Sequence, residues 1–215
     1  MSETAVRVPA PAATFADLVW PVRAAGAAGV ARAVVLAILG ACLLTISAKV
    51  QVPGPVPMTL QTLAVMALGA LLGMRLAVAS VALYLVQGLL GMPVFATTPP
   101  LVPGLAYFMG PTGGFLVGML GSAALVGLAA DRGLMRQPLS FAFILLAADT
   151  LVFVSGFLWL AFAAQTATGV AGLGATRAFA AGVQPFLLGE ALKLALAAAA
   201  IPAVFETLSR LVRRG

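Results

Sequence analysis

Residues 183–205, VQPFLLGEALKLALAAAAIPAVF, form an apolar stretch that carries two charges, Glu190 and Lys193. Apolar runs of about 20 residues have the length of a membrane-spanning helix. A lysine at the centre of such a helix costs roughly 2.5–3.5 kcal/mol on insertion scales, so an ionisable residue there indicates a functional site. Glu190 and Lys193 are three residues apart and share one helix face. We expect this face to look into a protein cavity rather than into lipid.

The composition of the whole chain indicates an all-α integral membrane protein. The 215 residues are 62% hydrophobic and 8% charged, with a mean hydropathy of +1.13, whereas soluble domains carry about 25% charged residues. The apolar runs are much longer than the roughly 10-residue strands of a membrane barrel. We expect a cytoplasmic tail (residues 1–22), one six-helix transmembrane domain (residues 23–207) and a basic cytoplasmic tail (residues 208–215).

Six membrane spans are predicted, at 26–48, 58–74, 76–90, 112–130, 139–164 and 183–207. A proline-rich loop separates the first two, and only Arg75 marks the turn between the short second and third spans. Residues 91–111 and 165–182 are predicted as loops. The segment 15–20 is compatible with a position at the membrane interface. A signal peptide is the alternative for the N-terminal region, but the first apolar run begins too far along the chain for that.

The distribution of basic residues sets the orientation, because cytoplasmic loops of membrane proteins are enriched in Lys and Arg. With both termini in the cytoplasm, the outer side carries only Lys49 and Arg177. Apart from Lys193 in the membrane, the remaining basic residues lie on the cytoplasmic side: Arg7, Arg23, Arg32, Arg75, Arg132, Arg136, Arg210, Arg213 and Arg214. The sequence therefore predicts a multi-pass protein of the cytoplasmic membrane whose three long loops face outward.

Several classes of function lack the residues they require. Neither lysine follows the glycine-rich loop of an ATPase, and an intramembrane serine protease would need a base beside its nucleophile. The chain has no histidine, which removes histidine-based catalysis and most metal sites. Its single cysteine, Cys42, excludes a disulfide within one chain.

Polar residues inside or at the ends of the spans are the other site candidates. Thr59 and Gln61 stand at the outer end of the second span, where they could also be a simple helix cap. Asp149 lies near the middle of the fifth span, with Trp159 nearer the outer side. A buried carboxylate must be protonated or paired, and Lys193 and Ser47 are possible partners. A ligand role and a role in holding helices together are equally compatible with Asp149.

Two patterns of small residues allow two interpretations each. Gly110-Pro111-Thr112-Gly113-Gly114-Phe115 is a loop-to-helix entry, in which Thr112 could cap the helix and backbone N–H groups could approach a ligand. Close helix packing through glycine is the alternative. In the first span Ala33, Ala37 and Ala41 form a stripe that could admit a helix of another protein or one of the same chain.

Four segments together resemble the BioY family, the biotin-binding S components of energy-coupling-factor (ECF) vitamin transporters. They are Pro55-Val56-Pro57-Met58-Thr59-Leu60-Gln61-Thr62-Leu63, Gly91-Met92-Pro93-Val94-Phe95, Gly110-Pro111-Thr112-Gly113-Gly114-Phe115-Leu116-Val117-Gly118 and Gln184-Pro185-Phe186-Leu187-Leu188-Gly189-Glu190-Ala191-Leu192-Lys193. They occur in the family's order, and the resemblance spans about residues 30–205. The family usually has Asp where Glu190 stands, so the acid is kept and its reach changes by one methylene.

The resemblance implies six helices, cytoplasmic termini and a high-affinity biotin pocket near the outer surface, covered by the first long loop. It also implies assembly with a transmembrane T component and two ATPase subunits, with the first helix as the docking surface. The stripe of Ala33, Ala37 and Ala41 is similar to the family's alanine motif there. Biotin would be the ligand, and no cofactor is expected.

The candidate residues suit the chemistry of biotin, which has a ureido ring, an apolar thiophane ring and a carboxylate tail. Carboxylates can accept from the ureido N–H groups, an ammonium or amide can donate, and aromatic rings can form the wall. Which residue meets which group of biotin is not determined by the sequence. The predicted site residues are Thr59, Gln61, Tyr107, Gly110, Thr112, Gly113, Asp149, Trp159, Glu190 and Lys193.

Three other functions remain as alternatives. An S component for another vitamin, such as thiamine or riboflavin, is disfavoured by the Gly-Pro-Thr-Gly-Gly segment. An intramembrane enzyme could use Asp149 and Glu190 as paired carboxylates, but the sequence offers no nucleophile or metal constellation. If the protein were a purely structural scaffold, nothing would explain why a membrane span carries Lys193 despite its free-energy cost of insertion.

Overall fold

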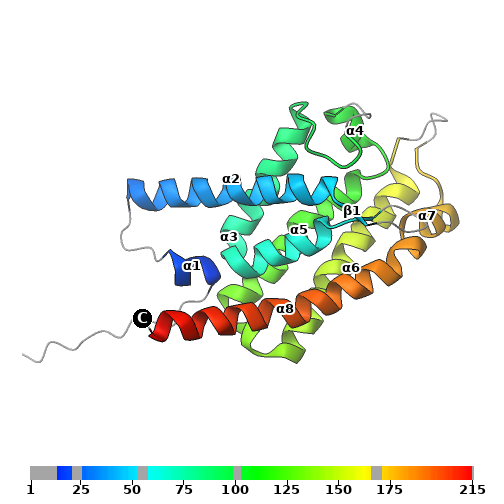
Figure 1. Cartoon of the computed structure of the whole chain (residues 1–215). Coiled ribbons are helices and arrows are strands. Elements are labelled where there is room, and N and C mark those ends of the chain that lie inside the picture. The colour runs from blue at the N-terminus through cyan, green and yellow to red at the C-terminus, as the bar shows by residue number, and fades with distance from the viewer. Residues whose placement is uncertain (1–13, 21–25, 53–57, 99–102, 166–170, 215) are drawn as a thin grey trace, which may run out of the picture.

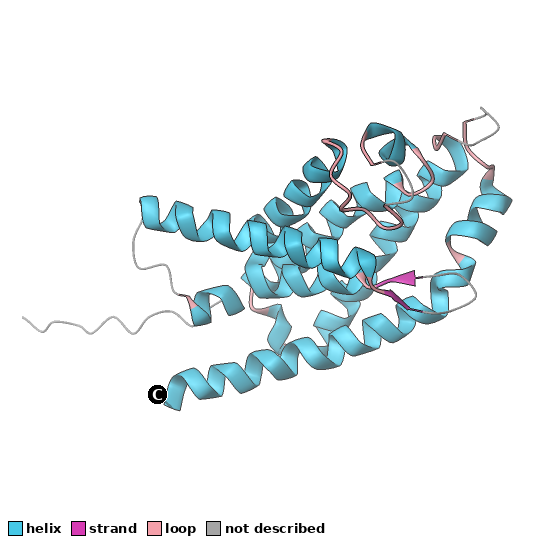
Figure 2. Cartoon of the chain, turned by 45° about the horizontal axis from the view of Figure 1, so that its top comes forward, coloured by secondary structure: helices cyan, strands magenta, loops and turns pink. Residues whose placement is uncertain are grey.

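The computed structural model describes residues 14–20, 26–52, 58–98, 103–165 and 171–214, which form a bundle of long helices (Figures 1 and 2). The strands β1 (Gln51–Val52) and β2 (Met58–Thr59) pair antiparallel, with Gln51 opposite Thr59. The helices are α1 (Phe15–Val19), α2 (Ala27–Lys49), α3 (Gln61–Leu89), α4 (Leu105–Met109), α5 (Gly113–Asp131), α6 (Pro138–Phe162), α7 (Ala175–Gly182) and α8 (Leu187–Arg214), with short 3-10 turns η1 (Leu134–Arg136) and η2 (Gln184–Phe186).

Five helices among the described residues are long and apolar enough to cross a membrane, and one of them, α3, is folded back on itself. The Nε2 of Gln61 donates a hydrogen bond to the hydroxyl of Tyr84 at 2.9 Å. In a straight helix these residues would lie about 34 Å apart, at 1.5 Å per residue. The two halves of α3 are therefore antiparallel neighbours and correspond to the predicted second and third spans. The prediction of an all-α, multi-pass membrane protein is confirmed.

Gly73 makes the turn between the two halves of α3. Its backbone has φ 76° and ψ 173°, a conformation that is essentially restricted to glycine. Asp131, at the end of α5, accepts a hydrogen bond from the N–H of Met74 at 3.1 Å. The turn was expected at Arg75. It lies two residues earlier because glycine can adopt the required backbone angles and Asp131 satisfies the N–H that the broken helix leaves without a partner.

The helices place α1 and the last turns of α8 at one end of the bundle, and the β1–β2 hairpin and α7 at the other (Figure 1). At the first end Phe15 packs on a buried cluster that includes Met135 and Phe205. An ion pair of 3.2 Å between Asp17 and the buried Arg32 ties α1 to α2. The segment that was expected at the membrane interface is thus a short helix packed against the bundle.

Several predicted boundaries were wrong. The second span begins at Gln61 rather than Met58, because Met58 and Thr59 pair with β1. The predicted loops contain α4 and α7, which are too short to give a clear periodic pattern. The last helix continues past 207 to Arg214, since its basic final turn is favourable at a helix C-terminus. Residues 1–13 and 53–57, which include most of the predicted tail and the proline-rich loop, lie outside the described residues.

Candidate functional site

Glu190 and Lys193 form a buried ion pair on α8. The Lys193 ammonium donates to Glu190 Oε1 at 2.6 Å, and both residues are less than 10% exposed. Their spacing of three residues brings the two side chains together on one helix face, as predicted. Burying such a pair costs free energy because two charges lose their contact with water. This cost is offset only when further hydrogen bonds satisfy both charged groups.

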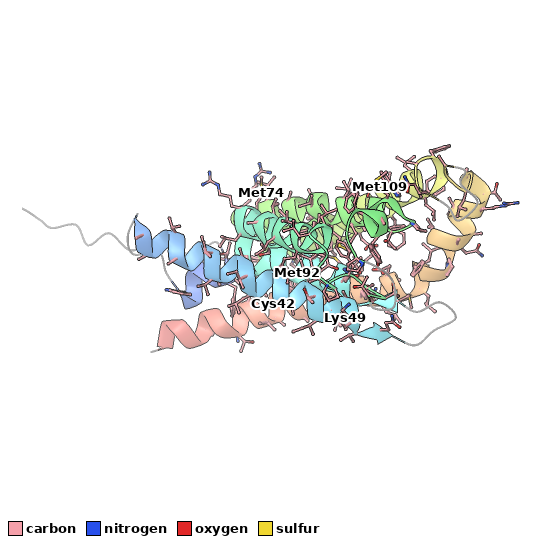
Figure 3. The ribbon with its side chains drawn as sticks, turned by 90° about the horizontal axis from the view of Figure 1, so that it is seen from above. Cys42, Lys49, Met74, Met92 and Met109 are labelled. Atoms are coloured by element: carbon pink, nitrogen blue, oxygen red, sulfur yellow. The ribbon has the colours of Figure 1, made fainter. Side chains whose placement is uncertain are left out.

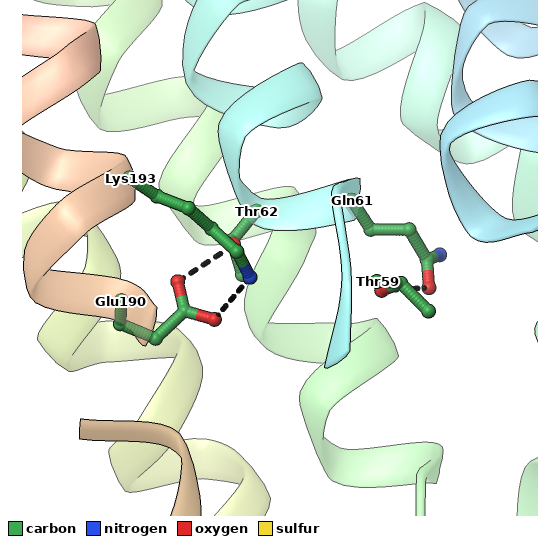
Figure 4. Close-up of polar contacts among 5 residues, drawn as sticks. All are labelled: Thr59, Gln61, Thr62, Glu190 and Lys193. Atoms are coloured by element: carbon green, nitrogen blue, oxygen red, sulfur yellow. Dashed lines mark hydrogen bonds and ion pairs between the residues drawn. The ribbon is translucent and has the colours of Figure 1, made fainter. Parts of the chain in front are cut away.

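Thr62, in the first turn of α3, completes the pair (Figure 4). Its hydroxyl donates to Glu190 Oε2 at 2.7 Å and accepts from the Lys193 ammonium at 3.3 Å. Both carboxylate oxygens of Glu190 therefore have a donor. This threonine lies inside the segment 55–63 but is not among the ten predicted site residues. A hydroxyl directly after Gln61, at the start of a predicted span, was the signal available.

A cavity of about 440 Å³ lies between α6 and α8, opens to the outer surface of the bundle and borders on Glu190 of this pair. Its size falls within the range of small-molecule sites, and its wall has the apolar and aromatic character typical of them. Among its lining residues are Asp149, Phe153, Phe157, Phe179, Val183 and Glu190. Of the ten predicted site residues, Asp149 and Glu190 line this cavity directly.

Asp149 lies on the α6 side of the cavity and is 7% exposed. Its Oδ1 is buried without a hydrogen-bond partner among the described residues. Ser47, one of the two partners considered from the sequence, instead donates to the Leu44 carbonyl of its own helix at 2.8 Å. The Asp149 carboxyl is thus an acceptor next to the cavity with capacity to bind a donor.

Gln61 and Thr59 belong to a second group of polar residues on the other side of the first turn of α3. Thr59 donates to Gln61 Oε1 at 3.0 Å, and Gln61 Nε2 donates to Tyr84 at 2.9 Å. Figure 4 shows the Gln61 side chain pointing away from Thr62. Tyr84 was missed in the sequence, although a tyrosine hydroxyl within an apolar span needs a partner.

Trp159, Gly110 and Gly113 meet in a third group, where α5 and α6 cross. The Trp159 indole N–H donates to the Gly110 carbonyl at 2.9 Å. A Cβ atom at Gly113 would collide with the Phe108 carbonyl and come within 3.1 Å of the Trp159 ring. This contact favours the close-packing interpretation of Gly113. Thr112 does occupy the N-cap position of α5, but its side chain makes no capping hydrogen bond, so its predicted role as a cap was wrong.

Tyr107 lies in α4, where its ring stacks on Phe95 with ring centres 4.9 Å apart. Its hydroxyl donates to the Ala96 carbonyl at 2.8 Å. Phe95 also packs edge-to-face on Tyr84, at 5.5 Å. Tyr107 is therefore linked through Phe95 to the Gln61 group rather than to the cavity.

The alanine stripe of α2 faces partly inward. Ala41 is fully buried in the core, while Ala33 and Ala37 are half-buried. The opposite face of α2 exposes large apolar residues such as Leu39 and Ile46. In this structure Ala41 packs within the chain and leaves no surface for a partner, so a docking role can rest only on Ala33 and Ala37.

Comparison with known proteins identifies the family. The model of the BioY family matches residues 16–210. The chain belongs to the BioY family. It is 33% identical to a Pyrococcus horikoshii protein named "Probable biotin transporter BioY" over 78% of this chain and 92% of that protein. It is also 33% identical to the biotin transporter BioY2 of Lactococcus lactis subsp. cremoris, over 74% of this chain and 81% of that one.

The fold is also shared with a solved structure. The chain resembles the crystal structure of the S-component for biotin from an ECF-type ABC transporter, with a TM-score of 0.68, 21% identity, and coverage of 85% of this chain and 95% of that chain. All four segments that carried the BioY resemblance take part in the contacts described above. The segment around Gln61 and the segment around Glu190 meet through Thr62, and the segments around Phe95 and Gly110 meet through α4.

Proposed function

We propose that this protein is the biotin-binding S component of an ECF-type transporter and serves high-affinity biotin uptake across the cytoplasmic membrane. The match of the BioY family over nearly the whole chain carries this proposal, and the relatives named above are biotin transporters by name. Biotin is the ligand, and the protein needs no cofactor. The names of the relatives disfavour an intramembrane enzyme built on Asp149 and Glu190.

The geometry of the site is compatible with biotin. The α6–α8 cavity combines aromatic walls with two carboxyl groups, which can accept from the two ureido N–H donors. The Lys193 ammonium is already bound to Glu190 and Thr62. A ligand that reaches this pair replaces Thr62 as its hydrogen-bond partner. It therefore does not have to strip water from an unpaired charge, which limits the free-energy cost of desolvation on binding.

We further propose that both termini are cytoplasmic and that a T component and two ATPases supply the energy for transport. The end of the bundle that holds α1 and the last turns of α8 also carries Arg32, Arg75, Arg132, Arg136 and Arg210, as expected for the cytoplasmic side. Lys49 and Arg177 lie toward the opposite end. The half-buried Ala33 and Ala37 of α2 offer small side chains to a docking helix.

A thermal-shift panel of vitamins tests the proposed ligand. Purified protein in detergent is heated with biotin, thiamine, riboflavin or no addition. A ligand at about 100 times its dissociation constant stabilises the folded state by about 2.7 kcal/mol, so biotin alone should raise the unfolding temperature clearly. Stabilisation by another vitamin and not by biotin would assign the protein to that vitamin, and stabilisation by none, in folded protein, would contradict a vitamin-binding role.

A further inference from the structure

Lys49, the last residue of α2 (labelled in Figure 3), binds the segment 91–98 that follows α3. Its ammonium donates to the Phe95 carbonyl at 2.6 Å, to the Thr98 hydroxyl at 3.2 Å and to the Thr98 carbonyl. These three acceptors match the three donors of a lysine. The residue itself is exposed, whereas Phe95 and Thr98 are almost completely buried. Lys49 therefore holds the buried turn at residues 95–98 in place by hydrogen bonds from an exposed position.

The segment 91–98 holds residues on both sides of it in place. The Phe95 ring packs between Tyr84 of α3 and Tyr107 of α4, and Ala96 accepts from the Tyr107 hydroxyl. A side chain at Gly88 would overlap the Phe95 ring, so the ring is seated directly on the α3 backbone. Loss of the Lys49 bonds would loosen the support of both tyrosines.

The series of contacts that begins at Lys49 extends through Tyr84 to the candidate binding site. Tyr84 accepts from Gln61 in the first turn of α3, and Thr62, the next residue, binds Glu190 and Lys193. Lys49 does not itself line the α6–α8 cavity. Its acceptors are neutral, and its exposed ammonium can exchange them for water, so the bonds can open and re-form without stranding a buried charge.

We propose that Lys49 is a positioning residue that fastens the segment 91–98 and thereby sets how fast the ligand enters and leaves the site. This inference rests on the proposed function, since it concerns exchange of the same ligand. Lys49→Met removes the donors while keeping most of the apolar stem. Lys49→Arg keeps a charged donor that can still reach neighbouring carbonyl oxygens. Arg177→Met is the matched control, because it removes a positive charge from α7 and leaves Lys49 intact.

Hydrogen exchange in the ligand-free proteins tests the fastening directly. Amides of the segment 91–98 should exchange faster in Lys49→Met, by about tenfold or more, which corresponds to roughly 1.4 kcal/mol of lost protection. Wild-type protein, Lys49→Arg and Arg177→Met should keep slow exchange there. Equal exchange in Lys49→Met and wild type would overturn the inference.

Stopped-flow measurements of biotin exchange test the consequence. In Lys49→Met both the association and the dissociation rate constants should rise, and Lys49→Arg should restore them towards wild type. A purely structural defect would reduce the fraction of protein that binds without raising the association rate, and that result would overturn the inference. If wild type binds biotin and Lys49→Met exchanges it equally fast, only the inference fails. If folded wild type does not bind biotin at all, the proposed function fails and the rate-setting role falls with it.

Discussion

Gln61 and Thr62 are consecutive residues in the first turn of α3, and their side chains join two different networks. Gln61 binds Thr59 and Tyr84, whereas Thr62 binds Glu190 and Lys193 of α8. One helical turn thus connects the β1–β2 hairpin, the second half of α3 and the charged pair on α8. This turn is the structural centre of the candidate site.

The Gln61–Tyr84 bond should contribute to stability. Tyr84→Phe leaves the buried Gln61 amide without its acceptor, which costs roughly 1–3 kcal/mol of unfolding free energy. Unfolding in a denaturing detergent measures the loss. The double variant Gln61→Leu/Tyr84→Phe removes both polar partners and should recover part of the stability. Additive losses in the double variant would show that the two side chains do not support each other.

The turn at Gly73 should be sensitive to a single methyl group. Gly73→Ala forces a side chain into a backbone conformation that costs roughly 1–3 kcal/mol, and the new Cβ would collide with Asp131. Gly133→Ala is the matched control, because Gly133 has a similar φ of 71° but no atom within 4 Å of a Cβ. Gly133→Ala should therefore lower the unfolding free energy by only about 1 kcal/mol. Equal losses in the two variants would contradict the role of the Asp131 contact.

Ala37 and Ala41 of the alanine stripe should respond differently to replacement by a large side chain. Ala37→Trp should leave biotin binding intact and weaken copurification with a coexpressed T component, because close helix approach tolerates no large side chain. Ala41→Trp should instead destabilise the fold itself, by roughly 1–3 kcal/mol or more, because Ala41 is buried in the core. Loss of biotin binding with intact assembly in Ala37→Trp would contradict the docking proposal.

Glu190→Gln should weaken biotin binding only moderately. The one oxygen of the amide has two lone pairs and can still accept from a ureido N–H and from Lys193, while the NH2 group that replaces the second oxygen can donate to the Thr62 hydroxyl. We expect a loss of about tenfold in affinity, or roughly 1.4 kcal/mol, measured by calorimetric titration. Glu190→Ala, which removes the acceptor altogether, should lose more. Equal affinities in the two variants would remove Glu190 from the list of ligand-binding residues.

The sequence predicted the membrane spans well because about 20 apolar residues in a row have few structural alternatives. It also predicted the Glu190–Lys193 pair, since helical spacing alone brings these residues together. The pair's third member, Thr62, could not be derived in the same way, because Thr62 and Glu190 are 128 residues apart in the chain and their contact depends on tertiary packing.

The grouping of the remaining candidates was also beyond the sequence. Gln61 and Tyr84 meet only because the chain reverses at Gly73. Trp159 and Gly113 share a contact because α5 and α6 pack closely, which favours the packing interpretation over ligand contact at that glycine. Sequence spacing identified the residue types that a site requires, whereas the fold decided which of them lie at the cavity and which support it.

Calorimetric titration of biotin into wild type and Lys193→Met tests the central claim most directly. We predict a dissociation constant in the nanomolar range for wild type, roughly −12 kcal/mol, and loss or strong reduction of binding in Lys193→Met while the protein still inserts and folds. The reason is that the variant removes the ammonium that orders Glu190 and Thr62, a charge-assisted interaction worth roughly 1.5–3 kcal/mol. If folded Lys193→Met bound biotin within about threefold of wild type, a difference below 1 kcal/mol, the pair would only hold helices together and the proposed site would be wrong.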